Sequence, residues 1–436
     1  MARMLSISCV SLSSALLVTT SVPALEAITY KGTVGRSEVI VELSDPDEGM
    51  MEGRYSYLRV GGDIPLHNVD GIDSFEFAEE APCTEETCIA DENGTISDPP
   101  IGAHWALTLA ADGTSLEGQW IPVGKSGKSL DIRLAEIGRR TLPKDTENSP
   151  MGLADSAFFR IHAYGDPVTA VTHPYEHAKM DVSLTEGAIQ DIDGSQLRFV
   201  TDPRTIFGFP RVVALVDGSS PDAANRALAS RHAAINVAAF SCLNNDYAGF
   251  SYSPYDSSIE SGSLGDYDGE IIAVSYLSPT VMGWTEAGST WCGGAHPNNH
   301  FDSFIIDVKT GGTLPLGRVF KHWVATSRIE ADADSAIDQT AALADPDQYL
   351  WGPGEPLIDY VLAHHRREAS EDCDIDELIT TNLGVRFGPG DTAIFSLEDL
   401  PHAIFACTED VLTVKLADIP ELLAPTASEY FPSLGR

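Results

Sequence analysis

The stretch that decides the fold of the C-terminal half reads WCGGAHPNNH, residues 291–300, and continues as FDSFIIDVKTGGTLPL, residues 301–316. The adjacent glycines Gly293 and Gly294 allow the backbone a positive φ or a close approach to another segment. Pro297 fixes its own φ and restricts the residue before it, so we expect His296 at a rigid bend. Beyond this bend, the pattern predicts a strand, a turn at the next glycine pair and a second strand.

The sequence around this motif alternates between strand-like and helix-like segments. Residues 197–200, 271–277 and 411–416 read as strands, and 180–184 as another. Ser220 and Pro221 are typical of a helix start, and further helices are expected near 323–342, 356–370 and after Asp418. Strands interrupted by helices, with hairpin-like pairs, predict an α+β domain with a mostly antiparallel sheet over residues 155–436.

Residues 28–141 have a different pattern, in which apolar side chains recur at every second position. Such alternation predicts strands with one buried face, as in 39–43, 105–109 and 130–134. Gly53 and Gly118 each follow a glutamate and lie two residues before an aromatic, which fits a sharp bend or close packing within a strand. We therefore expect an all-β meander that forms a small barrel or sandwich, joined to the second domain by a polar linker at 142–154.

The N-terminus is typical of a secretory signal peptide, residues 1–27. Arg3 supplies a positive charge, an apolar run follows from Leu5 to Val18, and small residues offer cleavage sites near Ala24 and Ala27. This run is too short to span a membrane, and we expect no later spanning segment. The sequence thus predicts an exported protein, secreted or periplasmic.

Cysteine usage agrees with export. Setting aside Cys9 in the signal peptide, an even number of cysteines remains, which favours disulfides in an exported chain. Several connectivities are possible, and the prediction follows proximity and sequence order: Cys83 with Cys88, Cys242 with Cys292, and Cys373 with Cys407. Their spacing matches no zinc site, and we expect neither a metal nor a cofactor.

The chain is strongly acidic, with a formal net charge of −38 over 436 residues. Such a charge argues against nucleic acid as a partner. A solvated acidic surface accounts for it, and steering of a cationic protein or peptide is the alternative. The sequence does not indicate an oligomeric state.

Several segments of residues 170–430 resemble a bacterial domain family of unknown function. The resemblance rests on the Gly-Gly-Ala-His loop at 293–296, the strand ending in Asp-x-x-Thr-Gly at 304–311 and the apolar segment at 314–320. The last strand and helix, 411–423, and Asn225 are also similar. That domain forms the extracellular part of lysozyme-sensing anti-sigma factors and precedes the catalytic domain of some peptidoglycan deacetylases. The resemblance implies an α+β fold and a cell-envelope setting, and it supplies no catalytic residues.

Candidate chemistry centres on His296. His296 and His300 have the spacing of two metal ligands on a helix, but the glycines and Pro297 argue against a helix there. A bond from His296 to the backbone at a tight bend is the favoured interpretation. The acidic run 372–377 lacks the glycine and glutamate of a calcium loop, and no serine lies in a nucleophile elbow.

The functional prediction is an exported binding protein of the cell envelope without enzymatic activity. Its ligand would be a cationic protein such as lysozyme, or cell-wall glycan. A hydrolase with a site near His296 is the alternative, and a purely structural module is a third. The residues expected to form the binding surface are Gly293, Gly294, Ala295, His296, Asn298, Tyr252 and Tyr255.

Overall fold

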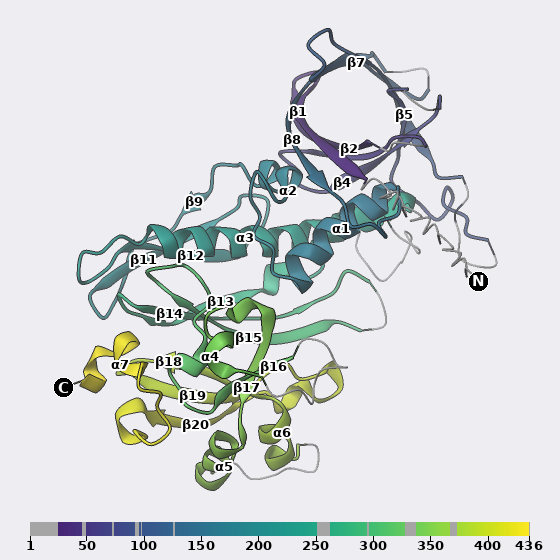
Figure 1. Cartoon of the computed structure of the whole chain (residues 1–436). Coiled ribbons are helices and arrows are strands. Elements are labelled where there is room, and N and C mark those ends of the chain that lie inside the picture. The colour runs from purple at the N-terminus through teal and green to yellow at the C-terminus, as the bar shows by residue number, and fades with distance from the viewer. Residues whose placement is uncertain are drawn as a thin grey trace, which may run out of the picture.

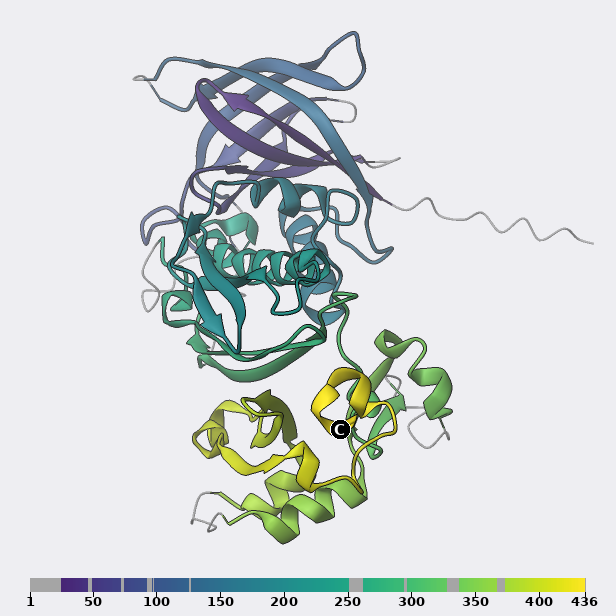
Figure 2. The ribbon, with the colours of Figure 1, turned by 90° about the vertical axis from the view of Figure 1, so that its left-hand side faces the viewer.

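A computed structural model of the chain describes residues 25–45, 49–71, 74–91, 96, 98–124, 127–250, 262–293, 296–327, 337–366 and 373–435. The predicted signal peptide lies outside these residues except for 25–27. Figures 1 and 2 show a barrel at one end of the molecule, a long helix across the middle and the C-terminal sheets at the other end.

The first domain is a closed antiparallel barrel, which decides between the two expected all-β forms. Its strands are β1 (Glu26–Val34), β2 (Ser37–Asp45), β3 (Glu52–Tyr57), β4 (Asp63–Asn68), β5 (Glu76–Glu80), β6 (Ile101–Leu109), β7 (Ser115–Pro122) and β8 (Leu130–Thr141). Inward-facing side chains such as Leu43, Tyr55, Phe77 and Trp105 fill the barrel and are fully or almost fully buried.

The two glycines of the repeated pattern lie where neighbouring strands come very close. A Cβ atom on Gly118 would be 1.9 Å from the carbonyl oxygen of Ala106, and one on Gly53 would be 2.5 Å from a methyl carbon of Leu43. A side chain at either position would therefore displace the adjacent strand or its packing. The predicted close packing at these glycines is confirmed.

Three helices connect the barrel to the rest of the molecule. They are α1 (Pro150–Ala163), α2 (Pro174–Lys179) and α3 (Asp222–Cys242). Because Ser149 accepts a bond from the amide of Gly152 and Pro150 occupies the first turn, α1 starts inside the segment 142–154 that was expected to be linker. Residues 180–184 were expected to be a strand. This prediction is wrong, because α2 ends there and the chain turns at Met180.

A buried network of charges joins the barrel to α2, and we call it the junction network. Its members are Glu42, Arg54, Asp63, Arg140, Glu176 and Lys179. Arg54 lies at its centre, paired with Glu42 at 2.7 Å and with Asp63 at 3.0 Å. Burial favours the neutral form of Glu42, but Arg140 and Arg54 outweigh it and lower the pKa of that carboxyl to about 2.

The C-terminal half consists of small antiparallel sheets with helices, as the α+β prediction required. One sheet contains β9 (Thr185–Glu186), β10 (Gln190–Ile192), β11 (Ser195–Thr201) and β12 (Gly208–Ala214), and a second contains β13 (Ile271–Leu277), β14 (Val281–Thr290) and β15 (Asn298–Asp307). The remaining strands are β16 (Trp323–Ser327), β17 (Tyr349–Pro353), β18 (Leu383–Gly388), β19 (Thr392–Leu397) and β20 (Asp410–Lys415). The other α-helices are α4 (Gln339–Ala342), α5 (Glu355–His364), α6 (Ile375–Thr381) and α7 (Ala427–Tyr430).

Some predicted elements of this half have a different form. Residues 323–327 belong to a strand rather than a helix, because they pair with β17. The strand expected beyond the Gly311-Gly312 turn is reduced to a single bridge between Ile306 and Thr313, and β15 pairs with β14 instead. The helix expected after Asp418 is also wrong, since the helical turn η8 (Leu416–Asp418) ends there.

Helix α3 packs between the first two of these sheets. Its apolar side, including Ala224, Leu228 and Ile235, shares one core with Phe209 of β12 and Trp284 of β14. The side-chain amide of Asn225 accepts a hydrogen bond from the Val212 amide and donates one to the Val212 carbonyl, each at 2.8 Å. Asn225 thereby fixes the first turn of α3 to β12, an edge strand of its sheet.

The structure contains all three expected disulfides, Cys83–Cys88, Cys242–Cys292 and Cys373–Cys407. Such bonds are compatible with a protein that folds in an oxidising compartment. A search of the described part of the chain for a helix of the length and apolarity needed to cross a membrane found none.

Candidate functional site

The segment around His296 lines a surface hollow of about 640 Å³, which we call the His296 hollow. Two parts of the chain form it, the first half of β15 and the loop that leads into η7 (His402–Cys407). Its lining residues are His296, Pro297, Asn298, Asn299, His300, Asp302, Asp399, Leu400, Pro401, His402 and Ala403.

Two histidines at the rim stack against each other. The rings of His296 and His402 are nearly parallel, with 4.8 Å between centroids. His296 Nδ1 bonds to the carbonyl oxygen of Pro297 at 3.0 Å, and His402 Nδ1 bonds to the side-chain oxygen of Asn299. The predicted bond from His296 to the backbone is confirmed, and both stacked histidines line the hollow.

His300 does not pair with His296 as two metal ligands on a helix would. It lies on strand β15 and bonds through Nε2 to both carboxylate oxygens of Glu270, at 2.9 and 3.0 Å. Burial acts to lower the pKa of His300, but the buried Glu270 carboxylate outweighs burial and raises it. The shift favours the protonated form of His300, and Glu270 is its paired carboxylate.

Asp302 is a carboxylate of the hollow without an ion pair among the described residues. Within the described part of the chain its carboxylate has no hydrogen bond or ion pair, although it is only partly exposed. Burial raises the pKa of Asp302; His300 and Arg231 oppose this, while Glu286 and Asp399 add to it. Asp399 approaches from the η7 loop with a positive φ of 55° and likewise shows no side-chain bond among described residues. The hollow thus holds two carboxylates that lack an ion-pair partner in that part of the chain.

The structure brings together only part of the predicted binding surface. His296 and Asn298 line the hollow, and Gly293 adopts a positive φ of 106°, as the motif required. The Cys242–Cys292 disulfide anchors the start of this loop to the end of α3. The other members of the predicted surface, Gly294, Ala295, Tyr252 and Tyr255, lie outside the described residues.

Sequence reasoning missed Asp302, Asp399 and His402. Asp302 follows His300 by two positions on a strand, so the period of two could have placed it on the same face. Asp399 and His402 come from a distant loop, and no local pattern links them to the Gly-Gly-Ala-His motif.

No metal site is found where one was considered. Among described residues, no group of three or more His, Cys, Asp or Glu side chains is arranged to hold a metal ion. In the acidic run 372–377, Asp374 caps helix α6 by accepting a bond from the Glu377 amide, and Cys373 is in a disulfide. The described part of this run is therefore structural.

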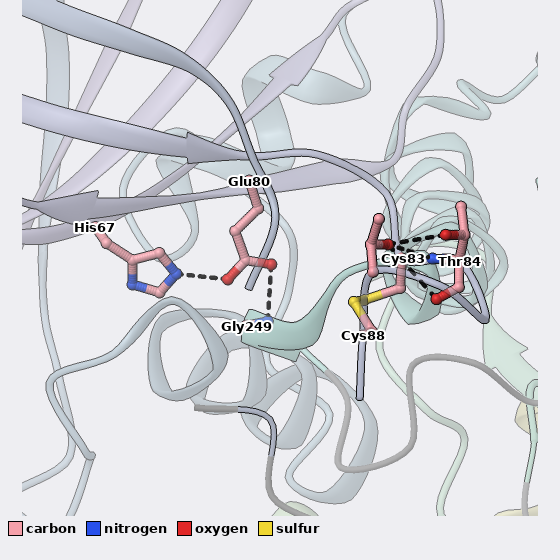
Figure 3. The surroundings of a disulfide bond; sticks show 7 residues. His67, Glu80, Cys83, Thr84, Cys88 and Gly249 are labelled. Atoms are coloured by element: carbon pink, nitrogen blue, oxygen red, sulfur yellow. Dashed lines mark hydrogen bonds and ion pairs between the residues drawn. A yellow bond between two sulfur atoms is a disulfide. The ribbon is translucent and has the colours of Figure 1, made fainter. Parts of the chain in front are cut away.

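A second histidine-carboxylate cluster lies on the outer face of the barrel, close to the Cys83–Cys88 disulfide (Figure 3). His67 bonds to Glu52 at 3.1 Å and to Glu80 at 2.6 Å, and Glu80 also accepts a bond from the Gly249 amide. Burial acts to lower the pKa of His67, but the two carboxylates outweigh it and raise the pKa to about 9. Both ring nitrogens of His67 are bonded to carboxylates, and Glu80 links this cluster to Gly249. We therefore interpret the cluster as a structural link between the barrel and the segment at Gly249.

Comparison of the chain with protein family models, curated proteins and solved structures found no match. The resemblance of residues 170–430 to the lysozyme-sensor domain remains an expectation from the motifs alone.

Proposed function

We propose that the protein is an exported binding protein of the cell envelope whose His296 hollow takes a cationic group of a basic protein partner. The observation that carries this proposal is the pair of carboxylates, Asp302 and Asp399, without an ion-pair partner in the described part of the chain. A lysine or arginine side chain of a partner would supply the missing charge.

Two further features support a basic partner. The net charge of −38 would accelerate the approach of a cationic protein and make the association rate sensitive to salt. The stacked imidazoles of His296 and His402 belong to the lining of the same hollow, and a guanidinium group can stack on such a planar ring. A basic lysozyme, suggested by the motif resemblance, is the first partner to test.

The test measures binding of a basic lysozyme to the purified protein at low and high salt. We expect Asp302→Asn combined with Asp399→Asn to weaken binding about tenfold or more, because the carboxylates meet the cation directly. The control Glu38→Gln with Glu117→Gln makes the same change in net charge on exposed barrel positions. An equal loss of lysozyme binding in both double variants would show that net charge alone causes it and would contradict a site at the hollow.

A second candidate function is an envelope hydrolase, favoured by the raised pKa of Asp302 in a hollow beside three histidines. A raised pKa increases the protonated fraction of a carboxyl group at a given pH, and the protonated form can act as a general acid. This function predicts release of soluble fragments from cell-wall glycan and its loss in both Asp302→Asn and His296→Ala. Unchanged release in either variant would remove this site from the reaction.

A further inference from the structure

A second cleft, of about 560 Å³, lies along α3 on the side that faces α2, and we call it the Arg211 cleft. Its polar walls come from Arg211 on β12 and from Arg226, Ser230, His232 and Asn236 on α3. Apolar side chains of Val168, Met180, Leu184, Ala227 and Ala233 complete it. The cleft shares no residue with the His296 hollow.

Arg211 brings a positive charge into this cleft without a carboxylate to balance it. Its guanidinium donates to the carbonyl oxygen of Pro210 at 2.8 Å and to His232 Nδ1 at 3.2 Å, and it has no ion pair within the described ranges. Burial lowers the pKa of Arg211 to about 10, and no neighbouring charge modifies this effect. A desolvated cation of this kind is costly unless an anion accompanies it.

The acidic residues that line the cleft are already engaged elsewhere. Asp202 bonds to Arg204 through Nε at 2.9 Å and Nη2 at 2.6 Å. Asp181 pairs with Lys31 Nζ at 3.1 Å. Neither forms an ion pair with Arg211 in the described part of the chain.

His232, which packs against Phe209, keeps Arg211 in its position at the wall of the cleft. It is 2% exposed, and its Nε2 has no hydrogen-bond partner among the residues that the structure describes. Because Arg211 donates to Nδ1, that nitrogen must accept, and the ring proton is on Nε2. Burial, together with Arg211, lowers the pKa of His232 to about 3, so the ring is neutral and presents a buried donor without an acceptor.

Arg226 adds a second cation to the same cleft. It is exposed on α3, and no ion pair involves it in the part of the chain that is described. In a chain with 65 acidic and 27 basic residues, two arginines without carboxylate partners in one cleft are unexpected. Small residues at 223, 227, 230 and 233 leave room along the same face of the helix.

We propose that the Arg211 cleft binds a small organic oxyanion, a carboxylate or a phosphate attached to an apolar body. Arg211 and Arg226 hold the anionic oxygens, since a planar guanidinium matches either group with two parallel N–H donors. The alanine, valine and methionine side chains contact the apolar part. This site goes beyond the proposed recognition of a basic partner, because it takes a ligand of opposite charge at a different place.

The test is a calorimetric titration of the full chain with sodium phosphate and, separately, with sodium hexanoate at constant ionic strength. We expect saturable binding of at least one probe with a Kd of about 1 mM or lower. Phosphate alone would identify a phosphate site, and hexanoate alone a carboxylate with an apolar tail. No saturable binding of either probe would overturn the proposal.

Three variants locate the binding. Arg211→Lys keeps the charge but loses the paired donors, so we expect about tenfold weaker binding. Arg226→Gln changes an exposed helix position, where we expect little effect on stability, and binding should weaken about threefold. The control Arg36→Gln removes an exposed arginine of the barrel and should leave Kd unchanged. If Arg211→Lys and Arg226→Gln both bind like the control, the probe binds elsewhere and the proposal fails.

Discussion

The junction network and the His296 hollow both gather charged side chains, but they differ in how those charges are balanced. In the junction network, each carboxylate lies within ion-pair distance of an arginine or lysine, with Glu42 held by both Arg54 and Arg140. In the hollow, Asp302 and Asp399 have no such partner within the described residues. Burial of charged side chains is therefore not enough to identify a functional site, since the buried charges of the junction network are paired and join the barrel to α2.

The largest expected effect is at the junction network. Arg54→Met would remove the buried guanidinium that pairs with Glu42, Asp63 and Glu176. We expect a loss of about 3–5 kcal/mol in the free energy of unfolding, measured by urea denaturation at pH 7. Arg36→Met, at an exposed position, should change it by no more than about 0.5 kcal/mol. Similar values for the two variants would mean that the network has no structural role.

The second largest loss of stability is expected when the Cys242–Cys292 disulfide is removed. Replacing Cys242 and Cys292 by serine removes a cross-link between residues 50 apart, which we expect to cost about 2–4 kcal/mol. Hydrogen exchange should increase at His296–His300 and stay unchanged at β2 and β3, because Cys292 lies four residues before His296 in the chain. Equal increases at the junction network would show that the two regions unfold together. Removal of Cys83–Cys88, with a separation of 5, should cost less.

The His67 cluster extends the comparison to a charge that is paired but partly exposed. Its pKa is about 9 in the folded state and ordinarily near 6.5, so protonated His67 stabilises the fold. This contribution is complete below about pH 6.5 and is lost as the pH rises through about 9. Allowing for solvent screening, we expect wild type to lose about 1–2 kcal/mol relative to His67→Gln between pH 6 and pH 9.5. Parallel stability curves of the two proteins over this range would contradict the pairing.

The smallest effect, and one of opposite sign, is expected in the hollow. The raised pKa of Asp302 means that its ionised form is disfavoured in the folded state. Asp302→Asn should therefore stabilise the protein slightly at pH 7, as measured by urea denaturation. The difference should disappear as the pH falls below the ordinary aspartate pKa, where both proteins are neutral at this position. A clear loss of stability in Asp302→Asn would place this residue with the paired, structural charges.

The sequence predicted the barrel well because its signals are local. Alternation in 39–43 and 105–109 reports which face of each strand is buried, and Gly53 and Gly118 mark the close approaches. Other elements depended on tertiary contacts. Residues 323–327 have a pattern compatible with a helix, but their pairing with β17 decided their structure. The six-residue helix α2 is too short to show a period.

The candidate site was predictable only where it belongs to one continuous stretch. Gly293, His296 and Asn298 were found because glycine and proline have strong local effects on the backbone. Asp302 is a candidate because Asp399, from a distant loop, lines the same hollow and because His300 is already paired with Glu270. Arg211 is a candidate because Asp181 and Asp202 are paired with other residues. Such absences of a partner are properties of the folded chain, and no residue pattern reports them.

Asn225 has a consequence for how the protein behaves at high concentration. Strand β12 ends its sheet, and an unpaired backbone N–H and C=O at Val212 would invite a strand of another molecule to add there. Because the side-chain amide of Asn225 hydrogen-bonds to both groups, they are not available to a strand of another molecule.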